Sequence, residues 1–386
     1  MTIHPRLIEK LESHTVSRSP SIPVILYYCR PRNEVRQCIL HRYGPIKYEL
    51  PFINAMALDL PPEKVKLIGK ERMVQWVTED VTVSKAVISK THGVGESEAT
   101  SLKTPSRPSQ SPVSVAIIDT GVALHPALTQ PVNRIRAFTD FVNHKAEPYD
   151  DDGHGTHIAG IVSGLASWPD QKEQGKGEGR VNIVAVKALD EEGNGSASDI
   201  LAAMQWTLNN SRFYNIRVVN LSLGVTAEED YDNDPLVRGV DVLTRYGLTV
   251  VTAAGNSGPN PKTISSPGIC RNAITVGASD GETVATFSSR GPTPQGLLKP
   301  DLLAPGVDVL SLKGEDSGYL SQSGTSMAAP FVSREAALLY ETFPFASPWL
   351  IKHLLLQQTK PLPKEPPEAQ GRGVLQMKSY SSTRMI

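Results

Sequence analysis

The sequence predicts an α/β protein with a main domain built on a parallel sheet with helices on both faces, preceded by a small α+β module. The chain has 386 residues, enough for a large domain and an additional module. From Val113 onward, short apolar segments typical of buried strands alternate with segments typical of helices. Hydrophobic residues make up 39% of the chain and the formal net charge is −1, which suits a globular protein with no overall field toward nucleic acid or anionic membrane.

The first 112 residues divide into three stretches. Residues 1–20 carry charges and prolines, and they predict a poorly ordered tail. Residues 21–85 alternate strand-like and helix-like patterns, starting with the apolar run Ile22–Tyr28, and predict the α+β module, which would have a ferredoxin-like fold. Residues 86–112 are dominated by Ser, Thr, Pro, Gly and charge, so we expect an exposed linker of the kind that proteases cut.

The main domain is expected over residues 113–360, followed by a Pro-, Ser- and charge-rich tail at residues 361–386. Apolar runs predict strands at Val113–Ile118, Val181–Ala188, Val218–Leu223, Leu248–Ala253 and Ala273–Ala278. Periodic segments rich in small residues predict helices at Ile158–Leu165 and Ser198–Leu208.

Two candidate catalytic residues stand where predicted strands and helices meet. Asp119 directly follows a buried strand, at the edge where sites form in parallel sheets, although alone it is more simply a turn aspartate. His154 lies in the run DGHGTHIAG, whose glycines let a loop turn tightly into a helix. A histidine titrates near neutral pH and suits proton transfer. His157 follows one helical turn later, but the spacing of a zinc-protease pair is absent.

A third and a fourth candidate complete the pattern. Ser326 lies among small residues just before an apolar helix, whose N-terminus favours developing negative charge; the simpler alternative is a helix N-cap. A serine hydroxyl becomes a strong nucleophile only beside a base. Asn256, in the turn Ala253–Gly258, is placed to offer a side-chain amide to an oxyanion, or is an ordinary loop residue.

Together these segments are specific. They are AIIDTGV (116–122), DGHGTHIAG (152–160), NLSLG (220–224), AAGNSG (253–258) and GTSMAAP (324–330). They occur in the order Asp, His, Ser, with further matches at SSPG (265–268), FSSRGP (287–292) and KPDLLAPG (299–306). By these motifs the chain resembles the subtilisin-like serine proteases, or subtilases, over about residues 113–356. The lack of an apolar signal segment, the few cysteines and the run AEPYDDDGHG (146–155) together most resemble the intracellular AprX-type bacterial subtilases.

The resemblance implies a role for each matching residue. Asp119 would orient the imidazole of His154, which acts as general base and then acid, and Ser326 would attack the scissile carbonyl. Asn256 would form an oxyanion hole with the backbone N–H of Ser326. The substrate would be bound by residues along the cleft: Ser222, Leu223, Gly224, Ala253, Ala254 and Gly255.

The same resemblance implies a self-processing zymogen. Residues 21–85 would be the propeptide, acting as an intramolecular inhibitor, and the linker at residues 86–112 would hold the processing site. Polypeptides are the expected substrates, with a large apolar or aromatic residue before the scissile bond because the pocket walls are small. The chemistry requires no cofactor. Three sparse cysteines without a CxxC pair, and no apolar signal segment, predict a cytoplasmic protein with neither nucleic acid nor membrane as a partner.

Two departures from the family pattern leave alternatives open. Arg334 replaces a small residue expected on the helix behind Ser326, and Arg334 and Glu335 are not expected to pair with each other because they are adjacent on the helix. This favours, as the alternative, an impaired subtilase acting as a binding or scaffolding protein. Structural calcium is possible at Asp150–Asp152, where a solvated loop is the simpler interpretation. An esterase is disfavoured because no GxSxG elbow surrounds Ser326.

Overall fold

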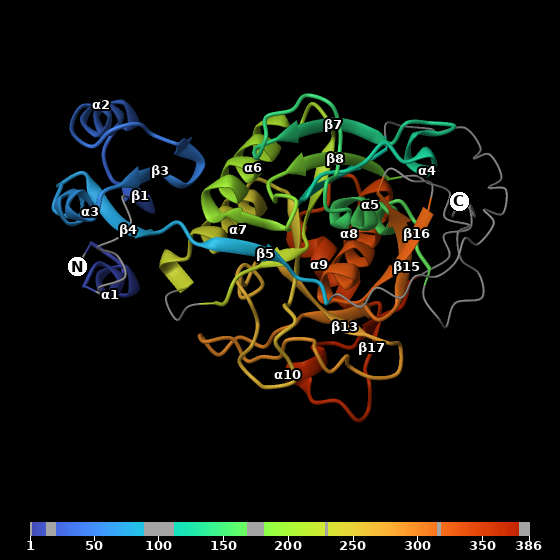
Figure 1. Cartoon of the computed structure of the whole chain (residues 1–386). Coiled ribbons are helices and arrows are strands. Elements are labelled where there is room, and N and C mark those ends of the chain that lie inside the picture. Colours follow the sequence, from blue (N-terminus) through green and yellow to red (C-terminus); the bar gives the residue numbers. More distant parts are fainter. Residues whose placement is uncertain are drawn as a thin grey trace.

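The structure, a computed structural model, describes residues 2–12, 21–88, 112–167, 181–227, 231–314 and 318–377. A small N-terminal domain lies beside a larger domain, and one extended segment runs from the first onto the second (Figure 1). Predictions that fall on residues 13–20, 89–111, 168–180 and 378–386 lie outside the described residues.

The N-terminal domain is a four-stranded antiparallel sheet with the order β2-β3-β1-β4. Its elements are β1 (Ile22–Tyr28), α2 (Arg32–Arg42), β2 (Tyr48–Leu50), the 3-10 turn η2 (Pro51–Ile53), β3 (Ala55–Leu60), α3 (Pro62–Ile68) and β4 (Val74–Glu79). This is the βαββαβ order of ferredoxin-like domains. β1 is apolar throughout because both faces are covered: Val24 and Leu26 pack beneath the domain's own helices, while Ile25 and Tyr27 face the larger domain.

The predicted poorly ordered tail at residues 1–20 is wrong for the part that is described. Helix α1 (Pro5–Glu12) buries Leu7 completely in the N-terminal domain. Ahead of it, backbone hydrogen bonds join His4 and Thr2 to Val77 of β4. The charges of this stretch lie on the outer face of an amphipathic helix, so a composition that suggested disorder instead supplies one more covering element.

The larger domain is a nine-stranded sheet with the order β17-β18-β14-β13-β12-β10-β6-β8-β7, parallel except for β17. The strands are β6 (Ser114–Asp119), β7 (Ile135–Asp140), β8 (Asn182–Lys187), β10 (Ile216–Leu221), β12 (Thr249–Ala253), β13 (Ile274–Ser279), β14 (Leu302–Pro305), β17 (Thr359–Lys360) and β18 (Val374–Leu375). Each of the five predicted strands is present within two residues of its expected bounds.

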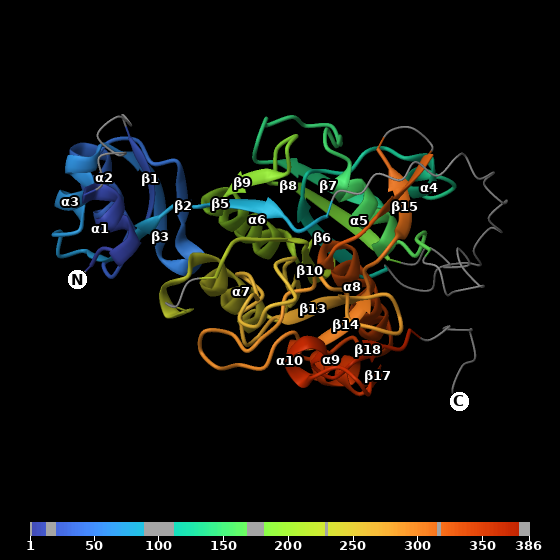
Figure 2. The same cartoon turned by 60° about the horizontal axis from the view of Figure 1, so that its bottom comes forward.

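Helices cover both faces of this sheet, as predicted (Figure 2). On one face lie α5 (His154–Val162), α8 (Thr325–Thr342) and α9 (Pro348–Leu356); on the other lie α6 (Ala197–Asn210) and α7 (Pro235–Arg245). Strand β6 shows the division, since Val115 and Ile117 point to the first layer and Ala116 and Ile118 to the second. Helix α5 begins at His154 rather than at the predicted Ile158, because Gly155, which suggested a loop, fits inside it.

Shorter elements complete the domain. They are α4 (Pro126–Thr129), β9 (Asn194–Ser196), β11 (Leu223–Gly224), η3 (Tyr231–Asn233), β15 (Val309–Lys313), β16 (Gly318–Gln322) and α10 (Pro367–Gln370). The predicted tail at residues 361–386 is wrong as far as residue 377, because β18 joins the sheet beside β14 and buries Leu375. Among the described helices, none combines the length and the apolar character that a bilayer crossing requires.

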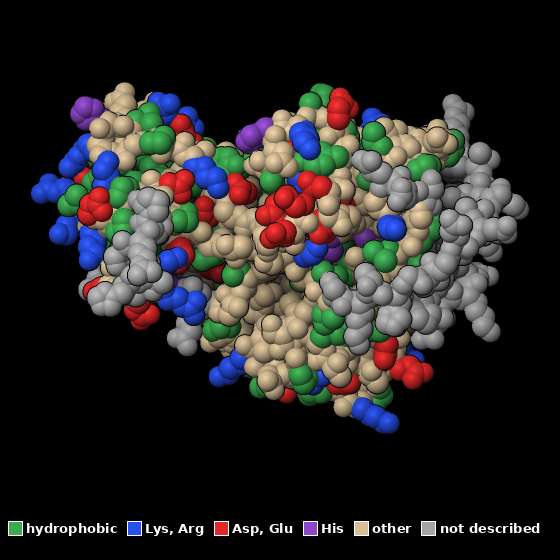
Figure 3. Space-filling view, viewed as in Figure 1, with side chains coloured by type: hydrophobic (Ala, Val, Ile, Leu, Met, Phe, Trp, Pro, Cys, Tyr) green, Lys and Arg blue, Asp and Glu red, His purple; other side chains and the backbone are tan. Residues whose placement is uncertain are grey.

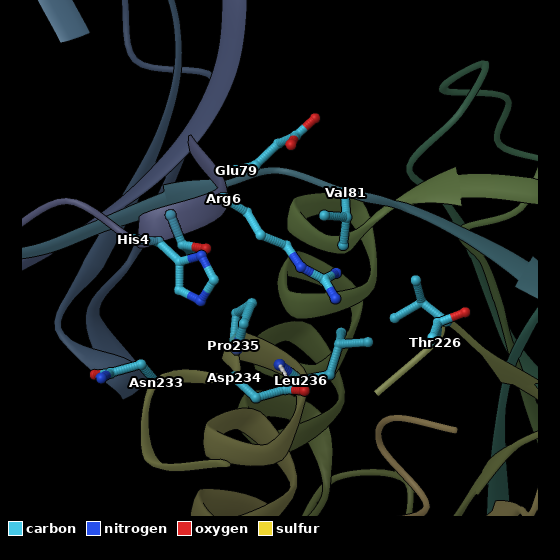
Figure 4. Close-up of a pocket in the computed structure, with 11 residues that line it drawn as sticks. His4, Arg6, Glu79, Val81, Thr226, Asn233, Asp234, Pro235 and Leu236 are labelled. Atoms are coloured by element: carbon cyan, nitrogen blue, oxygen red, sulfur yellow. Dashed lines mark hydrogen bonds between the residues drawn. The ribbon is translucent and has the colours of Figure 1, made fainter. Parts of the chain in front are cut away.

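The N-terminal domain docks on α6 and α7. Lys47 forms an ion pair with Asp199 at 3.0 Å, and the ring of Tyr27 lies 4.2 Å from the guanidinium carbon of Arg238. A cavity of about 110 Å³ lies between the two domains in part of the interface. The side chain of Arg6 projects into this cavity toward the start of α7, where Asp234 is the N-cap residue (Figure 4). This interface positions the strand that follows the domain, β5 (Thr82–Lys85), which pairs with β9 and β11 of the larger domain.

Candidate active site

Asp119 and His154 come together from the end of β6 and the start of α5. His154 Nδ1 lies 2.6 Å from Asp119 Oδ1, and both side chains are buried. The same carboxylate oxygen accepts the backbone N–H of Thr120 at 2.8 Å. A buried carboxylate held on this side of the ring leaves Nε2 as the nitrogen free to take a proton.

The loop before α5 is ordered by the carboxylate of Asp150. It accepts the backbone N–H groups of Gly153 at 2.8 Å and Thr156 at 2.7 Å, which satisfies donors at the start of the helix. Gly155 is required for a close approach, because a Cβ there would fall 2.0 Å from the carbonyl oxygen of Gly121, in the loop after β6. These contacts bring the start of α5 against the end of β6 and thereby His154 against Asp119.

Ser326 lies at the start of α8 and is buried. Its Oγ donates to the carbonyl oxygen of Ser222 at 2.9 Å. His154 Nε2 is buried with no hydrogen-bond partner. The structure therefore joins the first two members of the predicted triad by a hydrogen bond. Ser326 Oγ has to rotate away from Ser222 before it can bond to the imidazole, and catalytic hydrogen bonds often form only once substrate is bound.

Asn256 is oriented by a residue that the sequence analysis missed. Its Oδ1 accepts both the N–H and the hydroxyl of Thr325, at 3.0 and 2.9 Å. The amide nitrogen Nδ2 is consequently turned away, buried and without a partner. A side-chain carbon built on Gly324 would fall 2.7 Å from the carbonyl oxygen of Ala86 and 3.3 Å from Asn256 Nδ2, so both atoms face this glycine. In the sequence, this contact could have been inferred from Thr325, the residue directly before Ser326 in the GTS motif.

The cleft is occupied by the chain's own residues 82–88. β5 forms the middle strand of a three-stranded sheet with β9 and β11. The N–H of Ala86 donates to the carbonyl oxygen of Ser222 at 3.2 Å, and the N–H of Ile88 donates to that of Ser323 at 2.9 Å. The N–H of Ser326 faces the carbonyl oxygen of Ala86 at 3.3 Å. The prediction of an exposed linker beginning at residue 86 is therefore wrong for residues 86–88.

The predicted substrate-binding residues differ in whether they contact the segment that occupies the cleft. Leu223 and Gly224 pair in register with Lys85 and Ser84. Gly224 and Gly255 line a cleft of about 480 Å³, and a side-chain carbon on either would lie within 3 Å of Ser265 Oγ. Ala253 and Ala254 are buried behind this cleft rather than lining it. Strand β9, which pairs with the other edge of β5, was not predicted, because a short Gly-Asn-Gly-Ser turn carries no periodic signal.

His157 has a structural role. Its ring is fully buried and Nε2 lies 3.1 Å from the carbonyl oxygen of Val309 and 3.0 Å from that of Leu320. Burial, together with the neighbouring His154, lowers the pKa of His157 to about 3. The ring is thus neutral and donates from Nε2 to these carbonyls. Across the described ranges no three His, Cys, Asp or Glu side chains form a metal-binding group.

The acidic run that was a candidate cation site is bonded to protein groups. Besides the contacts of Asp150, Asp151 forms an ion pair with the buried Lys187 at 2.6 Å, and Asp152 pairs with Lys85. Lys187 also donates to the carbonyl oxygen of Thr120, which follows Asp119. The three carboxylates thus brace the loop around His154 rather than converging on one point.

The expectation that Arg334 and Glu335 do not pair is wrong. The guanidinium of Arg334 donates to Glu335 Oε1 at 3.0 Å, and 23% of the Arg334 side chain remains exposed. Its guanidinium lies over Gly164, where a Cβ would fall 2.9 Å from Nε. The long side chain curls back across the helix into the space left by that glycine, so the charge is paired and partly solvated.

The chain matches the model of the subtilase family over residues 110–373. It is 40% identical to the serine protease AprX of Bacillus subtilis (strain 168), over 68% of this chain and 64% of that protein. It is 34% identical to an alkaline protease of Alkalihalobacillus alcalophilus, over 77% and 72% of the two chains. Among solved structures it resembles a cold adapted subtilisin-like serine proteinase, with a TM-score of 0.54, 29% identity, and coverage of 68% and 86%.

Proposed function

The chain belongs to the subtilase family, and from this premise we propose that it is a serine endopeptidase that cuts polypeptides through an acyl-enzyme. In the proposed reaction Ser326 Oγ attacks the scissile carbonyl carbon and passes its proton to His154 Nε2. The tetrahedral oxyanion accepts hydrogen bonds from Asn256 Nδ2 and the N–H of Ser326. His154 then protonates the departing amine, and water repeats the sequence to release the acid.

The observation that carries this proposal is the peptide segment in the cleft. The carbonyl oxygen of Ala86 faces the N–H of Ser326, one of the two proposed oxyanion donors, while the buried Asp119–His154 pair stands ready as the base. Asn256 Nδ2, buried without a partner, is the second donor that such an oxygen needs. An unsatisfied buried donor is costly, and a developing oxyanion would satisfy it.

We further propose that the protein is a zymogen that processes itself between Ala86 and Val87. The register supports this bond, since Ala86 pairs with Ser222 on one side and Ile88 with Ser323 on the other. The N-terminal domain would stay bound after cleavage through its contacts with α6 and α7, and so act as the intramolecular inhibitor. Polypeptides are the proposed substrates; cytoplasmic location and the exclusion of nucleic acid and membrane stay predictions from the sequence.

The test is to identify the N-terminus of the purified full-length chain and to assay it on labelled casein. We expect a mature species that begins at Val87, and casein cleavage that increases as the N-terminal domain is lost. A chain that stays unprocessed and still leaves casein intact after prolonged incubation would contradict the proposal. A new N-terminus elsewhere, with active protease, would refute only the assignment of the Ala86–Val87 bond.

Replacing Asn256 with Ala is expected to lower kcat by about 10²–10³ with little change in KM, because the proposed donor contacts the oxyanion rather than the ground-state carbonyl. Steady-state kinetics with a fluorogenic peptide provide the measurement. Asn260→Ala, an exposed asparagine in the same loop, is the matched control and should retain full activity. Equal kinetics for the two variants would remove Asn256 from the oxyanion site.

The observation that favoured the alternative, an impaired subtilase acting as a scaffold, no longer supports it. It depended on an unpaired charge behind Ser326, and Arg334 is instead paired with Glu335 and partly exposed.

A further inference from the structure

Lys85 occupies a defined position in the cleft. With Ala86 as the residue before the scissile bond (P1), Lys85 is the P2 residue, and its backbone N–H donates to the carbonyl oxygen of Gly193 at 2.9 Å. Its ammonium group forms an ion pair with the carboxylate of Asp152. Only 21% of the Lys85 side chain and 10% of the Asp152 side chain are exposed, so water screens this pair less than an ordinary surface pair.

The space for the lysine stem is provided by Gly193. A Cβ at this glycine would fall 2.4 Å from Cδ of Lys85, 2.7 Å from Cε and 2.8 Å from Cγ. The stem therefore lies directly against the glycine backbone, and only its charged end reaches beyond it. A groove of this shape fits a long unbranched side chain and directs its tip toward Asp152.

Asp152 is held in place independently of the lysine. Its Oδ1 accepts the backbone N–H of His154 at 3.1 Å, which leaves Oδ2 as the oxygen that meets Lys85. The adjacent carboxylate, Asp151, is already paired with the buried Lys187. Acidic side chains also gather on this face just above the course of β5 (Figure 3). The local charge thus favours a cation at this position.

We propose that Asp152 and Gly193 form an S2 subsite that selects Lys or Arg at the P2 position of substrates. This inference rests on the proposed endopeptidase function and on the register that places Ala86 at P1. It adds a specificity-determining residue that lies outside the triad. It also makes Lys85 the feature that seats the chain's own processing site in the cleft.

The experiment uses the processed enzyme and quenched fluorescent peptides Val-Ser-X-Ala-Val-Ile, where X is Lys, Arg, norleucine or Glu. Norleucine matches the lysine stem without its charge. We expect kcat/KM for Lys to exceed that for norleucine roughly 10-fold and that for Glu roughly 100-fold, the scale of a charge-assisted hydrogen bond in a partly screened site. Equal kcat/KM for Lys, norleucine and Glu would overturn the proposal while leaving the protease assignment intact.

Asp152→Asn isolates the charge. Asn retains an oxygen to accept the N–H of His154, so the preference for Lys over norleucine should fall to within about 2-fold even if the absolute rate changes. Asp190→Asn is the matched control: Asp190 lies in the loop that carries Gly193 and accepts backbone N–H groups there, without contacting Lys85. A preference that falls equally in both variants would show a diffuse field rather than a subsite.

A readout independent of activity uses the full-length Ser326→Ala chain. Lys85→Glu should increase amide hydrogen exchange across residues 82–88 by at least about 10-fold, whereas Lys85→Arg should leave it unchanged. Should no peptide be cleaved at all, the proposed function fails, and this exchange difference still decides whether Asp152 recognises a cation. Identical exchange in the two variants would overturn the inference.

Discussion

Replacing Ser326 with Ala is expected to lower kcat/KM on a peptide substrate by about 10⁴-fold or more and to leave the chain at its full length of 386 residues. The reason is that no other described hydroxyl in the cleft combines an N–H aimed at the Ala86 carbonyl with the neighbouring Asp119–His154 pair. The alanine variant keeps that N–H and Asn256, so it should bind peptide but not form the acyl bond. Gel analysis and progress curves measure both effects.

A second variant separates chemistry from misfolding. His154→Ala should cost about as much as Ser326→Ala, and the double variant should be no worse than either, because the two groups act as a unit. All three should retain the unfolding midpoint of the starting chain within a few degrees. Additive losses would mean that Ser326 and His154 do not share one reaction step. Full self-processing in Ser326→Ala would exclude this serine as the nucleophile.

The sheet and the separate parts of the site were predictable because each depends on short-range signals. Val113–Ile118 and its sister runs are buried on both faces, so they are apolar throughout and easily recognised. Asp119 ends β6, His154 begins α5, and Ser326 lies in the first turn of α8, so each stands at or near the end of an element that the pattern indicated. Their positions thus followed from local pattern, and the family motifs supplied the roles.

What could not be predicted depends on contacts between distant residues. Leu7 orders the N-terminus only because the sheet around Val77 is there to receive it. Nothing in the polar segment that follows Val83 indicates that Ala86 reaches Ser222, since this contact depends on docking of the whole N-terminal domain. Arg334 was judged by its type, but Gly164, far away in sequence, provides the room for its side chain to meet Glu335.

One such set of contacts, the ion pairs of Asp301, is expected to contribute strongly to the free energy of unfolding of the larger domain. Asp301, just before β14, forms ion pairs with Lys299 at 2.6 Å and Lys352 at 2.8 Å and accepts the backbone N–H of Thr275 at 2.8 Å. Burial lowers the pKa of Lys299 to about 8, although Asp301 acts to raise it. Burial alone would raise the pKa of Asp301, but the two lysines hold it below its usual value.

Asp301→Asn is expected to destabilise the folded chain by roughly 3–5 kcal/mol, because it leaves Lys299 buried without a counter-ion. For a domain of this size that corresponds to a fall of about 10 °C in Tm. The measurement is thermal unfolding followed by circular dichroism in the Ser326→Ala background, which prevents self-digestion during heating. Asp232→Asn, at an exposed carboxylate, is the matched control and should change Tm by no more than about 2 °C.

The pH dependence distinguishes a lost charge from a lost shape. The pKa of Asp301 is lower in the folded chain than in the unfolded chain, so the ionised carboxylate stabilises the fold at pH values above about 4. This stabilisation is lost as the pH falls through the folded-state pKa, because the unfolded chain already holds the proton there. Asn does not titrate. The Tm difference between Asp301→Asn and its parent should therefore be largest near pH 7 and shrink below pH 4. A difference that stays constant across that range would assign the loss to packing around Thr275 instead of to the ion pairs.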